Sequence, residues 1–430
     1  MHDPATHLPN PPPAAALIDE ALRVAARTGR LDLSCGLSEF PREVFALADT
    51  LEVLNLSGNA LRSLPDDLPR LHRLRVLFGS DNQFTELPEV LGRCPQLEMV
   101  GFKANQIERV SGAALAPALR WLILTDNRIA ELPERIGACT RLQKLMLAGN
   151  HLRRLPAGLA ACRRLELLRI AANRFESVAD ALPDGVLALP QLAWLAHAGN
   201  PYGEEREAQA LDASPIANVG WADLQLGAPL GEGASGFIHH ALWQRAPGEP
   251  PQGVAVKLFK GAITSDGLPR SEMAACIAAG THDNLVGVEG RIAGHPQSAQ
   301  GLVLRLIPDG HRNLAGPPSL ASCTRDVYAD GLRLSTAQAL RIAHGMASAL
   351  AHLHRQGLAH GDLYAHNIVI NDDGDSLLGD FGAASFMPHG DAPRTAALQR
   401  IDRRALAHLI DELAQRCDEP GALDGVRAGC

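Results

Sequence analysis

Apolar residues in the first half of the chain recur with a period of 22 or 23 residues. Each unit follows a pattern in which leucine or another apolar residue stands at LxxLxL spacing and an asparagine follows, as in Leu142, Leu145, Leu147 and Asn150. Such alternation predicts one short strand per unit, whose inward side chains stack on those of the next unit. The asparagine amide can satisfy backbone groups where the chain turns. The asparagines at this position are Asn59, Asn82, Asn105, Asn127, Asn150, Asn173 and, after an insertion, Asn200.

This pattern resembles leucine-rich repeats over residues 31–200, which implies an α/β solenoid with parallel strands in a horseshoe. Residues 1–30 combine a proline-rich start with an amphipathic segment, 14–28, that we expect to be a helix capping the first edge. A plain helical array would require a period of 3.6, which these units do not show.

The concave face of such a horseshoe carries the side chains that alternate with the inward leucines. Phe78, Trp121, Ile123 and Met146 fall there in neighbouring units. An exposed apolar patch on a soluble protein usually marks a contact with another protein. The sequence leaves two interpretations open: these residues bind a partner or substrate protein, or they pack against the chain's own second domain.

The length of 430 residues favours two or more domains. Residues 201–219 are polar and acidic and are predicted to be a linker, so the second domain would span 220–430. The net charge of −8, without a basic run, gives no footprint for nucleic acid. Neither a long apolar run nor a signal peptide is evident, so we expect no membrane association and a cytoplasmic location.

Eight cysteines are present without a CxxC pair, which argues against zinc and favours reduced thiols. Cys94, Cys139 and Cys162 occupy the same position in successive repeats. We therefore expect them to be buried as small apolar residues.

The second half opens with a glycine-rich segment, in which Gly231, Gly233 and Gly236 fit GxGxxG. That motif alone also occurs in dinucleotide-binding folds, where a helix follows the glycines. Here a second β-like segment follows instead and contains Val254-Ala-Val-Lys257. Only four lysines occur in the chain, so a lysine at this position suggests a need for a compact ammonium group.

The glycine hairpin followed by VAVK resembles the nucleotide-covering loop and β3 lysine of the protein kinase family. The resemblance implies that Lys257 contacts the α- and β-phosphates of ATP and that Glu272, on a following helix, orients it. It also implies that residues 302–308 form the fifth strand and the hinge, with Leu304 as the gatekeeper beside adenine.

A predicted helix over 336–355 precedes His360-Gly-Asp-Leu-Tyr-Ala-His-Asn367 and, later, Asp380-Phe-Gly382. These segments resemble the kinase catalytic loop and the DFG motif. By resemblance, Asp362 accepts or orients the proton of the attacking group, while Asn367 and Asp380 hold Mg²⁺. Carboxylate and amide oxygens are suitable ligands for that hard cation.

Three departures from the family pattern stand out. Gly361 replaces the arginine that contacts a phosphorylated activation loop, and Tyr364 stands where serine/threonine kinases carry a lysine near the γ-phosphate. There is no APE motif, and only nineteen residues separate Gly382 from Asp402, which heads a segment resembling helix F. We therefore expect an α+β, bilobal, kinase-like domain with a truncated C-lobe, modest turnover and a reduced peptide-docking surface.

The sequence thus predicts an ATP- and Mg²⁺-dependent protein kinase with serine or threonine acceptors, whose repeats recruit a protein partner or substrate. One alternative is a pseudokinase scaffold that binds nucleotide without turnover. Another is a kinase for a small molecule. The intact set of Lys257, Asp362, Asn367 and Asp380 favours catalysis, whereas Tyr364 and the short C-lobe favour the scaffold.

Overall fold

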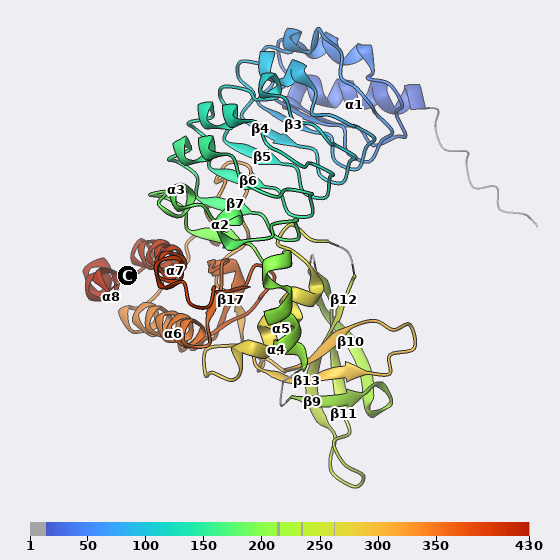
Figure 1. Cartoon of the computed structure of the whole chain (residues 1–430). Coiled ribbons are helices and arrows are strands. Elements are labelled where there is room, and N and C mark those ends of the chain that lie inside the picture. The colour runs from blue at the N-terminus through green and yellow to red at the C-terminus, as the bar shows by residue number, and fades with distance from the viewer. Residues whose placement is uncertain (1–13, 213–215, 234, 262, 430) are drawn as a thin grey trace, which may run out of the picture.

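The computed structural model describes residues 14–212, 216–233, 235–261 and 263–429, which form an arc of repeats and a second, bilobal body (Figure 1). Helix α1 (Ala14–Thr28) packs along the first strand of the arc, as expected for a cap. The proline-rich residues before it lie outside the described residues. No helix in the described part of the chain is both long enough and apolar enough to cross a bilayer.

The arc is built on one parallel sheet whose strands pair in chain order, which confirms the predicted solenoid. Adjacent strands keep the same register, so that Leu54 lies opposite Leu77 and Leu122 lies opposite Leu145. The strands are β1 (Arg30–Asp32), β2 (Val53–Asn55), β3 (Val76–Phe78), β4 (Met99–Gly101), β5 (Trp121–Ile123), β6 (Lys144–Met146), β7 (Leu167–Arg169) and β8 (Trp194–Ala196).

Short helices form the opposite, convex side of the arc. Proline at the N-cap fixes an extended entry into several of them, as at Pro88, Pro133 and Pro156. The helices are η1 (Arg42–Leu47), η2 (Leu68–Arg70), η3 (Glu89–Arg93), η4 (Gly112–Ala114), η5 (Glu134–Ala138), η6 (Ala157–Ala161), α2 (Val178–Ala181) and α3 (Asp184–Leu187).

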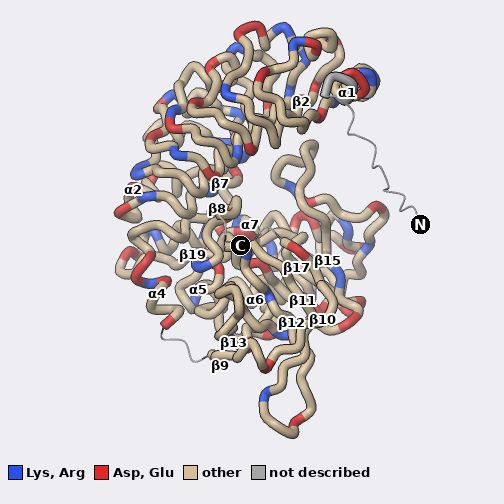
Figure 2. Tube along the Cα trace, turned by 90° about the vertical axis from the view of Figure 1, so that its right-hand side faces the viewer, with Lys and Arg blue, Asp and Glu red and all other residues tan. Residues whose placement is uncertain are grey.

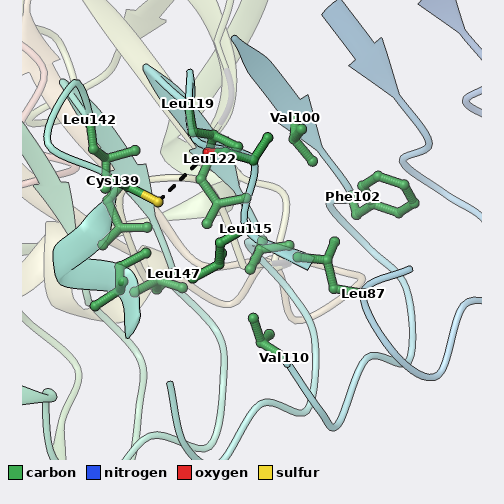
Figure 3. Packing of buried hydrophobic residues seen from close by; sticks show 14 of the residues in the cluster. Leu87, Val100, Phe102, Val110, Leu115, Leu119, Leu122, Cys139, Leu142 and Leu147 are labelled. Carbon is green, nitrogen blue, oxygen red and sulfur yellow. Dashed lines mark hydrogen bonds between the residues drawn. The ribbon is translucent and has the colours of Figure 1, made fainter. Parts of the chain in front are cut away.

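The core of the arc consists of stacked apolar side chains from successive units, as Figure 3 shows for residues between Leu87 and Leu147. Cys94, Cys139 and Cys162 are buried in this core, as predicted. The Cys139 Sγ–H points at the carbonyl oxygen of Ala116, at 3.9 Å. The seven described cysteines are all free thiols.

The repeat asparagines satisfy backbone groups between units. The Asn82 amide nitrogen donates to the carbonyl oxygens of Leu56 (2.9 Å) and Ser80 (3.0 Å), and its Oδ1 accepts from the amide of Leu61 (2.9 Å). Because each asparagine bonds to the preceding unit as well as its own, these amides join consecutive turns of the solenoid.

The smaller lobe of the second body is a six-stranded sheet in the order β10-β11-β12-β14-β13-β9, with helix α5 (Pro269–Ala279) beside it. Its first five strands are antiparallel, and only β9 pairs in parallel, with β13. The strands are β9 (Ala217–Gly220), β10 (Leu224–Glu232), β11 (Gly236–Trp243), β12 (Gln252–Phe259), β13 (Val288–Ala293) and β14 (Gly301–Arg305).

The predicted linker, 201–219, contains regular structure: η7 (Pro201–Gly203), α4 (Glu204–Asp212) and most of β9. The buried Glu207 on α4 accepts hydrogen bonds from the Gly199 amide (2.8 Å), at the end of the repeats, and from the Ser271 hydroxyl (2.7 Å) on α5. This segment therefore connects the last repeat to α5 by direct contacts.

The larger lobe is mainly helical. Helix α6 (Thr336–Arg355) begins with a capping box at Ser335 and Gln338 and packs against α7 (Ala392–Ala414). The other elements are η8 (Trp221–Asp223) before β10, and η9 (Ala365–Asn367), η10 (Pro420–Leu423), α8 (Asp424–Ala428), β15 (Arg312–Asn313), β16 (Leu358–Ala359), β17 (Ile368–Ile370), β18 (Ser376–Leu378) and β19 (Ser385–Phe386).

The arc and the larger lobe share a hydrophobic core. Met146, Leu167 and Trp194, from β6, β7 and β8, belong to the same cluster of buried residues as the apolar faces of α6 and α7. Figure 2 shows the arc curving over the second body until β7 and β8 meet it near β19 and α7. The concave face of the last repeats is therefore an interface within the chain.

Candidate active site

A cavity of about 840 Å³ lies between the two lobes of the second body. It is lined by the β10–β11 hairpin, by β12 and α5, by β14 with the segment after it, and by residues near Asn367 and Asp380. Among the predicted site residues, those on the wall of this cavity are Gly231, Gly233, Gly236, Lys257, Glu272, Leu304, Asn367 and Asp380. Asp362 does not line it.

Lys257 on β12 and Glu272 on α5 form an ion pair in the interior of the cavity. Glu272 is 2% exposed, and its pairing with Lys257 avoids an isolated buried charge. Burial works against the charged lysine, but Glu272 and Asp380 outweigh it and raise the pKa of Lys257 above its ordinary value. The lysine is therefore held as an ammonium group at the wall of the cavity.

The glycine hairpin joins β10 to β11, and its three glycines have different structural reasons for lacking a side chain. A side chain at Gly236 would meet the carbonyl oxygen of Leu258 at 2.4 Å, so packing excludes one. Gly231 and Gly233 have open space where a Cβ would stand, on the side of the cavity. Their absence of side chains leaves room for a ligand to approach the backbone.

Asp402 on α7 binds the backbone of the catalytic-loop segment. This carboxylate is 1% exposed and accepts hydrogen bonds from the backbone amides of His360 (2.8 Å) and Gly361 (2.9 Å). The His354 ring lies 3.1 Å from the same side chain. An acid at the start of the predicted helix F segment therefore fixes the backbone just before Asp362.

Asp362 and Asn367 lie in direct contact. The Asn367 amide nitrogen donates to the Asp362 carboxylate (2.9 Å) and to its backbone carbonyl (3.0 Å), which leaves the Asn367 Oδ1 as the free acceptor. Burial raises the pKa of Asp362 above its ordinary value. A carboxylate with a raised pKa is a better proton acceptor near neutral pH.

Asp380 adopts a left-handed backbone conformation with φ +51°, uncommon for a residue other than glycine. Its Oδ1 accepts from the amide of Gly382 at 3.0 Å, and both residues line the cavity. Asn367 Oδ1 and the Asp380 carboxylate suit Mg²⁺ chemically. Within the described residues no group of three or more His, Cys, Asp or Glu side chains could hold a metal, so water or phosphate oxygens would complete such a site.

The repeats contact the catalytic-loop segment directly, which sequence reasoning did not foresee. The Trp194 ring of β8 stacks on the Tyr364 ring with centroids 4.2 Å apart and planes 7° apart. The Trp194 indole N–H also donates to the carbonyl oxygen of Leu363 at 3.1 Å. Tyr364 is buried by this stacking, and its hydroxyl has no hydrogen-bond partner among the described residues.

Gly361 is explained by the same interface. Its φ of +71° and the surrounding backbone leave no room for a side chain, because a Cβ would lie 2.3 Å from the carbonyl oxygen of Leu195 and 2.8 Å from that of Ala383. The Leu195 amide donates to the Gly361 carbonyl at 3.1 Å. The family arginine is therefore absent where β8 approaches the loop backbone to backbone.

Arg169, on β7, is a further residue that the sequence analysis did not single out. Its guanidinium group is 2% exposed and forms ion pairs with Asp362 and with Asp266, the latter at 2.7 Å. Burial alone would lower the pKa of Arg169, but Asp362 and Asp266 outweigh it, so the group stays charged. An isolated arginine in an otherwise apolar or small concave column was the available sequence signal.

The four concave residues proposed as an apolar patch divide into two pairs. Met146 is buried in the core shared with the larger lobe, and Ile123 packs against that core. Phe78 and Trp121 are half-buried and do not belong to that core, and their ring centroids are 6.5 Å apart in an edge-to-face arrangement. Packing against the second body thus accounts for Met146 and Ile123.

Comparison with known families agrees with this architecture. Residues 224–405 match the model of protein tyrosine and serine/threonine kinases, and residues 50–71 match that of a leucine-rich repeat. Among solved structures, a leucine-rich-repeat protein of Leptospira interrogans aligns with a TM-score of 0.35 and 23% identity, over 42% of this chain and 52% of that one.

Curated relatives are similar at low identity. The chicken (Gallus gallus) serine/threonine-protein kinase mos is 28% identical over 40% of this chain, and the Dictyostelium discoideum protein named probable serine/threonine-protein kinase gdt4 is 27% identical over 40% of it. A rice (Oryza sativa subsp. japonica) protein named probable inactive leucine-rich repeat receptor kinase XIAO is 37% identical over 24% of it.

These alignments cover 50%, 10% and 8% of the relatives' own lengths, so the chain spans at most about half of each. The two family matches lie within the two bodies seen in the structure, residues 50–71 in the arc and residues 224–405 in the second body. The chain is a leucine-rich-repeat array joined to a protein kinase domain.

Proposed function

We propose that the chain is a protein kinase that uses ATP and Mg²⁺ to phosphorylate serine or threonine. The observation that carries the proposal is the convergence of the Lys257–Glu272 ion pair, Asn367 and Asp380 on one cavity, with Asp362 bonded to Asn367 behind it. Independent surface residues have no physical reason to converge in this way.

In this proposal each residue has one task. Lys257 binds the α- and β-phosphates of ATP, and Glu272 keeps the ammonium group in place. Asp362 accepts the proton of the substrate hydroxyl while the hydroxyl oxygen bonds to the γ-phosphorus. At the same time the bond between the γ-phosphorus and the departing ADP breaks. Leu304 borders the adenine site. Asn367 and Asp380 would hold Mg²⁺, which when bound neutralises phosphate charge.

The decisive assay is Mg²⁺-dependent transfer of labelled phosphate from ATP to the protein itself or to a generic protein substrate. Asp362→Ala and Lys257→Met are expected to lower transfer at least about a hundredfold. Asp373→Ala, which changes an exposed acid on the nearby β17–β18 loop, is the matched control and should retain activity. Equal transfer by wild type and Asp362→Ala would refute the catalytic assignment.

A pseudokinase scaffold is the second candidate, favoured by the stacking of Tyr364 on Trp194 and by the cover that β8 forms over the catalytic loop. The same cover reduces the surface available to a peptide, which keeps a small-molecule acceptor as a further alternative. Thermal stabilisation by Mg²⁺-ATP without transfer to any acceptor would support the scaffold.

We also infer that the repeats recruit a protein partner or substrate through the part of the concave face around Phe78 and Trp121, which are half-buried and outside the core shared with the larger lobe. Phe78→Ser is expected to weaken phosphorylation of a captured partner while leaving phosphorylation of a generic substrate unchanged. Loss of both activities together would contradict a recruiting role.

A further inference from the structure

Arg169 lies where three parts of the chain meet. It belongs to β7, a repeat strand close to the second body (Figure 1). Its Nε donates to Asp266 at 2.7 Å, its Nη1 donates to the carbonyl oxygen of Gly361 at 3.1 Å, and its Nη2 donates to Asp362. One guanidinium group therefore connects a repeat strand, the loop between β12 and α5, and the catalytic loop.

The contact with Asp362 fixes the orientation of that carboxylate. Arg169 occupies Oδ1 and the Asn367 amide occupies Oδ2, so the two oxygens are held by different segments. Each carboxylate oxygen has two acceptor sites, so one hydrogen bond to each leaves Asp362 able to accept another from a substrate hydroxyl. The two contacts orient the Asp362 carboxylate and still leave it able to accept a further hydrogen bond.

The catalytic loop has no cation of its own in this position. Tyr364 stands where a lysine is expected, and its ring is committed to Trp194. The charged and titratable groups acting on Asp362 are Arg169, Asp266, His366 and Asp380, with Tyr364 and Lys144 also close enough to interact. Of the cationic side chains in this set, Arg169 is the one hydrogen-bonded to the carboxylate.

Arg169 is also linked, through Asp266, to the cavity proposed to bind the nucleotide. Its second carboxylate partner, Asp266, lines the cavity, and the Asp266 Cβ lies 3.6 Å from where a side chain at Gly382 would begin. Because the planar guanidinium group of Arg169 binds one acid on each lobe, it restrains the distance between the two lobes. This restraint comes from the repeats.

We propose that Arg169, supplied by the repeat array, is a positioning residue of the kinase active site that orients Asp362 and provides the positive charge the catalytic loop lacks at Tyr364. The inference rests on the proposed kinase function and assigns the repeats a part in the chemistry in addition to recruitment. A kinase domain separated from β7 would then lack one component of its active site.

The test measures kcat and the KM for ATP in the full chain for wild type, Arg169→Ala and Arg169→Lys. Arg169→Ala should lower kcat about ten- to a hundredfold, as expected when a proton acceptor is misplaced, with the KM for ATP within about threefold. Arg169→Lys should retain intermediate activity, because a single ammonium can still reach one carboxylate. Added guanidinium ion at millimolar concentration should partly restore Arg169→Ala.

Arg404→Gln is the matched control. Arg404 on α7 also crosses the interface, where its hydrogen bonds within the described structure go to the carbonyl oxygens of Leu189 and Leu192 and not to the catalytic loop. Its replacement should leave kcat within about twofold. If it lowers kcat as much as Arg169→Ala, loosening of the interface explains the loss and the positioning role is refuted.

Two further results would overturn the proposal. If Arg169→Ala is as active as wild type or more active, the contact is neutral or acts as a brake on Asp362, while the kinase function stands. If neither wild type nor any Arg169 variant transfers phosphate, the kinase function fails and the positioning role fails with it. Arg169→Lys keeps the charge between Asp266 and Asp362, so it remains informative if Arg169→Ala does not fold.

Discussion

Replacing Gly361 with alanine should destabilise the contact between the repeats and the kinase domain. The new methyl group would lie 2.3 Å from the Leu195 carbonyl oxygen and 2.8 Å from that of Ala383, and neither backbone atom can rotate away. Overpacking of this kind costs about 1–3 kcal/mol. The φ of +71° adds about 1–2 kcal/mol for any residue with a Cβ. The expected loss in free energy of unfolding is therefore about 2–5 kcal/mol.

Gly390→Ala isolates the steric part of that cost. Gly390 has nearly the same φ, +72°, but no atom lies within 4 Å of where its Cβ would stand. Differential scanning calorimetry on the two variants should show a decrease in Tm that is larger for Gly361→Ala by about 2 °C or more. Equal decreases would refute the close approach of β8 to the catalytic loop. Gly361→Arg, which restores the family residue, should be worse than alanine.

Other consequences of the geometry can be measured on the same full-length chain. Trp194→Ala should lower the free energy of unfolding by about 3–5 kcal/mol, because it removes a buried ring stacked on Tyr364. Limited proteolysis should then cut the variant between the two bodies, whereas Trp221→Ala, in the smaller lobe, should not expose that junction. Asp402→Ala should lower the free energy of unfolding by about 2–5 kcal/mol, because it leaves the amides of His360 and Gly361 without a partner. Hydrogen exchange at these two amides should increase, and unchanged exchange would contradict the role of Asp402 in holding the loop. Burial lowers the pKa of His197 from 6.5 to about 4. As the pH decreases below 6.5, the unfolded chain therefore binds a proton that the folded chain does not, and the free energy of unfolding falls by roughly 2 kcal/mol at pH 5. Thermal melts of wild type and His197→Gln at pH 7.5 and 5 should show a smaller pH effect in the variant.

Sequence reasoning predicted the features that depend on local pattern. The repeat strands were predictable because inward residues such as Leu122 and Leu145 must alternate with exposed ones, and because Asn82 and its equivalents recur in phase. The pairing of Lys257 with Glu272 was expected from the resemblance to protein kinases. The roles of the predicted site residues remain predictions, although the structure brings most of them to one cavity.

The arrangement of the two bodies could not be predicted from sequence, because it depends on contacts between residues far apart in the chain. Arg169 and Trp194 occupy ordinary concave positions, and nothing in their neighbourhood identifies Asp362 or Tyr364 as partners. Glu207 looked like one acid in a polar linker, yet it is buried between Gly199 and Ser271. Gly361 and Tyr364 depart from the family motif, and the structure shows that both fit against β8.

Small side chains line the contact between the repeats and the residue that follows the DFG motif: Ala148, Ala171, Ala196 and Ala383 form a buried cluster of their own. Three of these alanines belong to the last three units of the array, and Ile123 of the unit before them also packs against the core of the larger lobe, so the kinase constrains the sequence of these final units more than that of the units near α1. Over evolution, units near α1 could be duplicated, lost or exchanged without altering the kinase contact. An engineer could likewise graft a new recognition surface at that end and keep the final units intact.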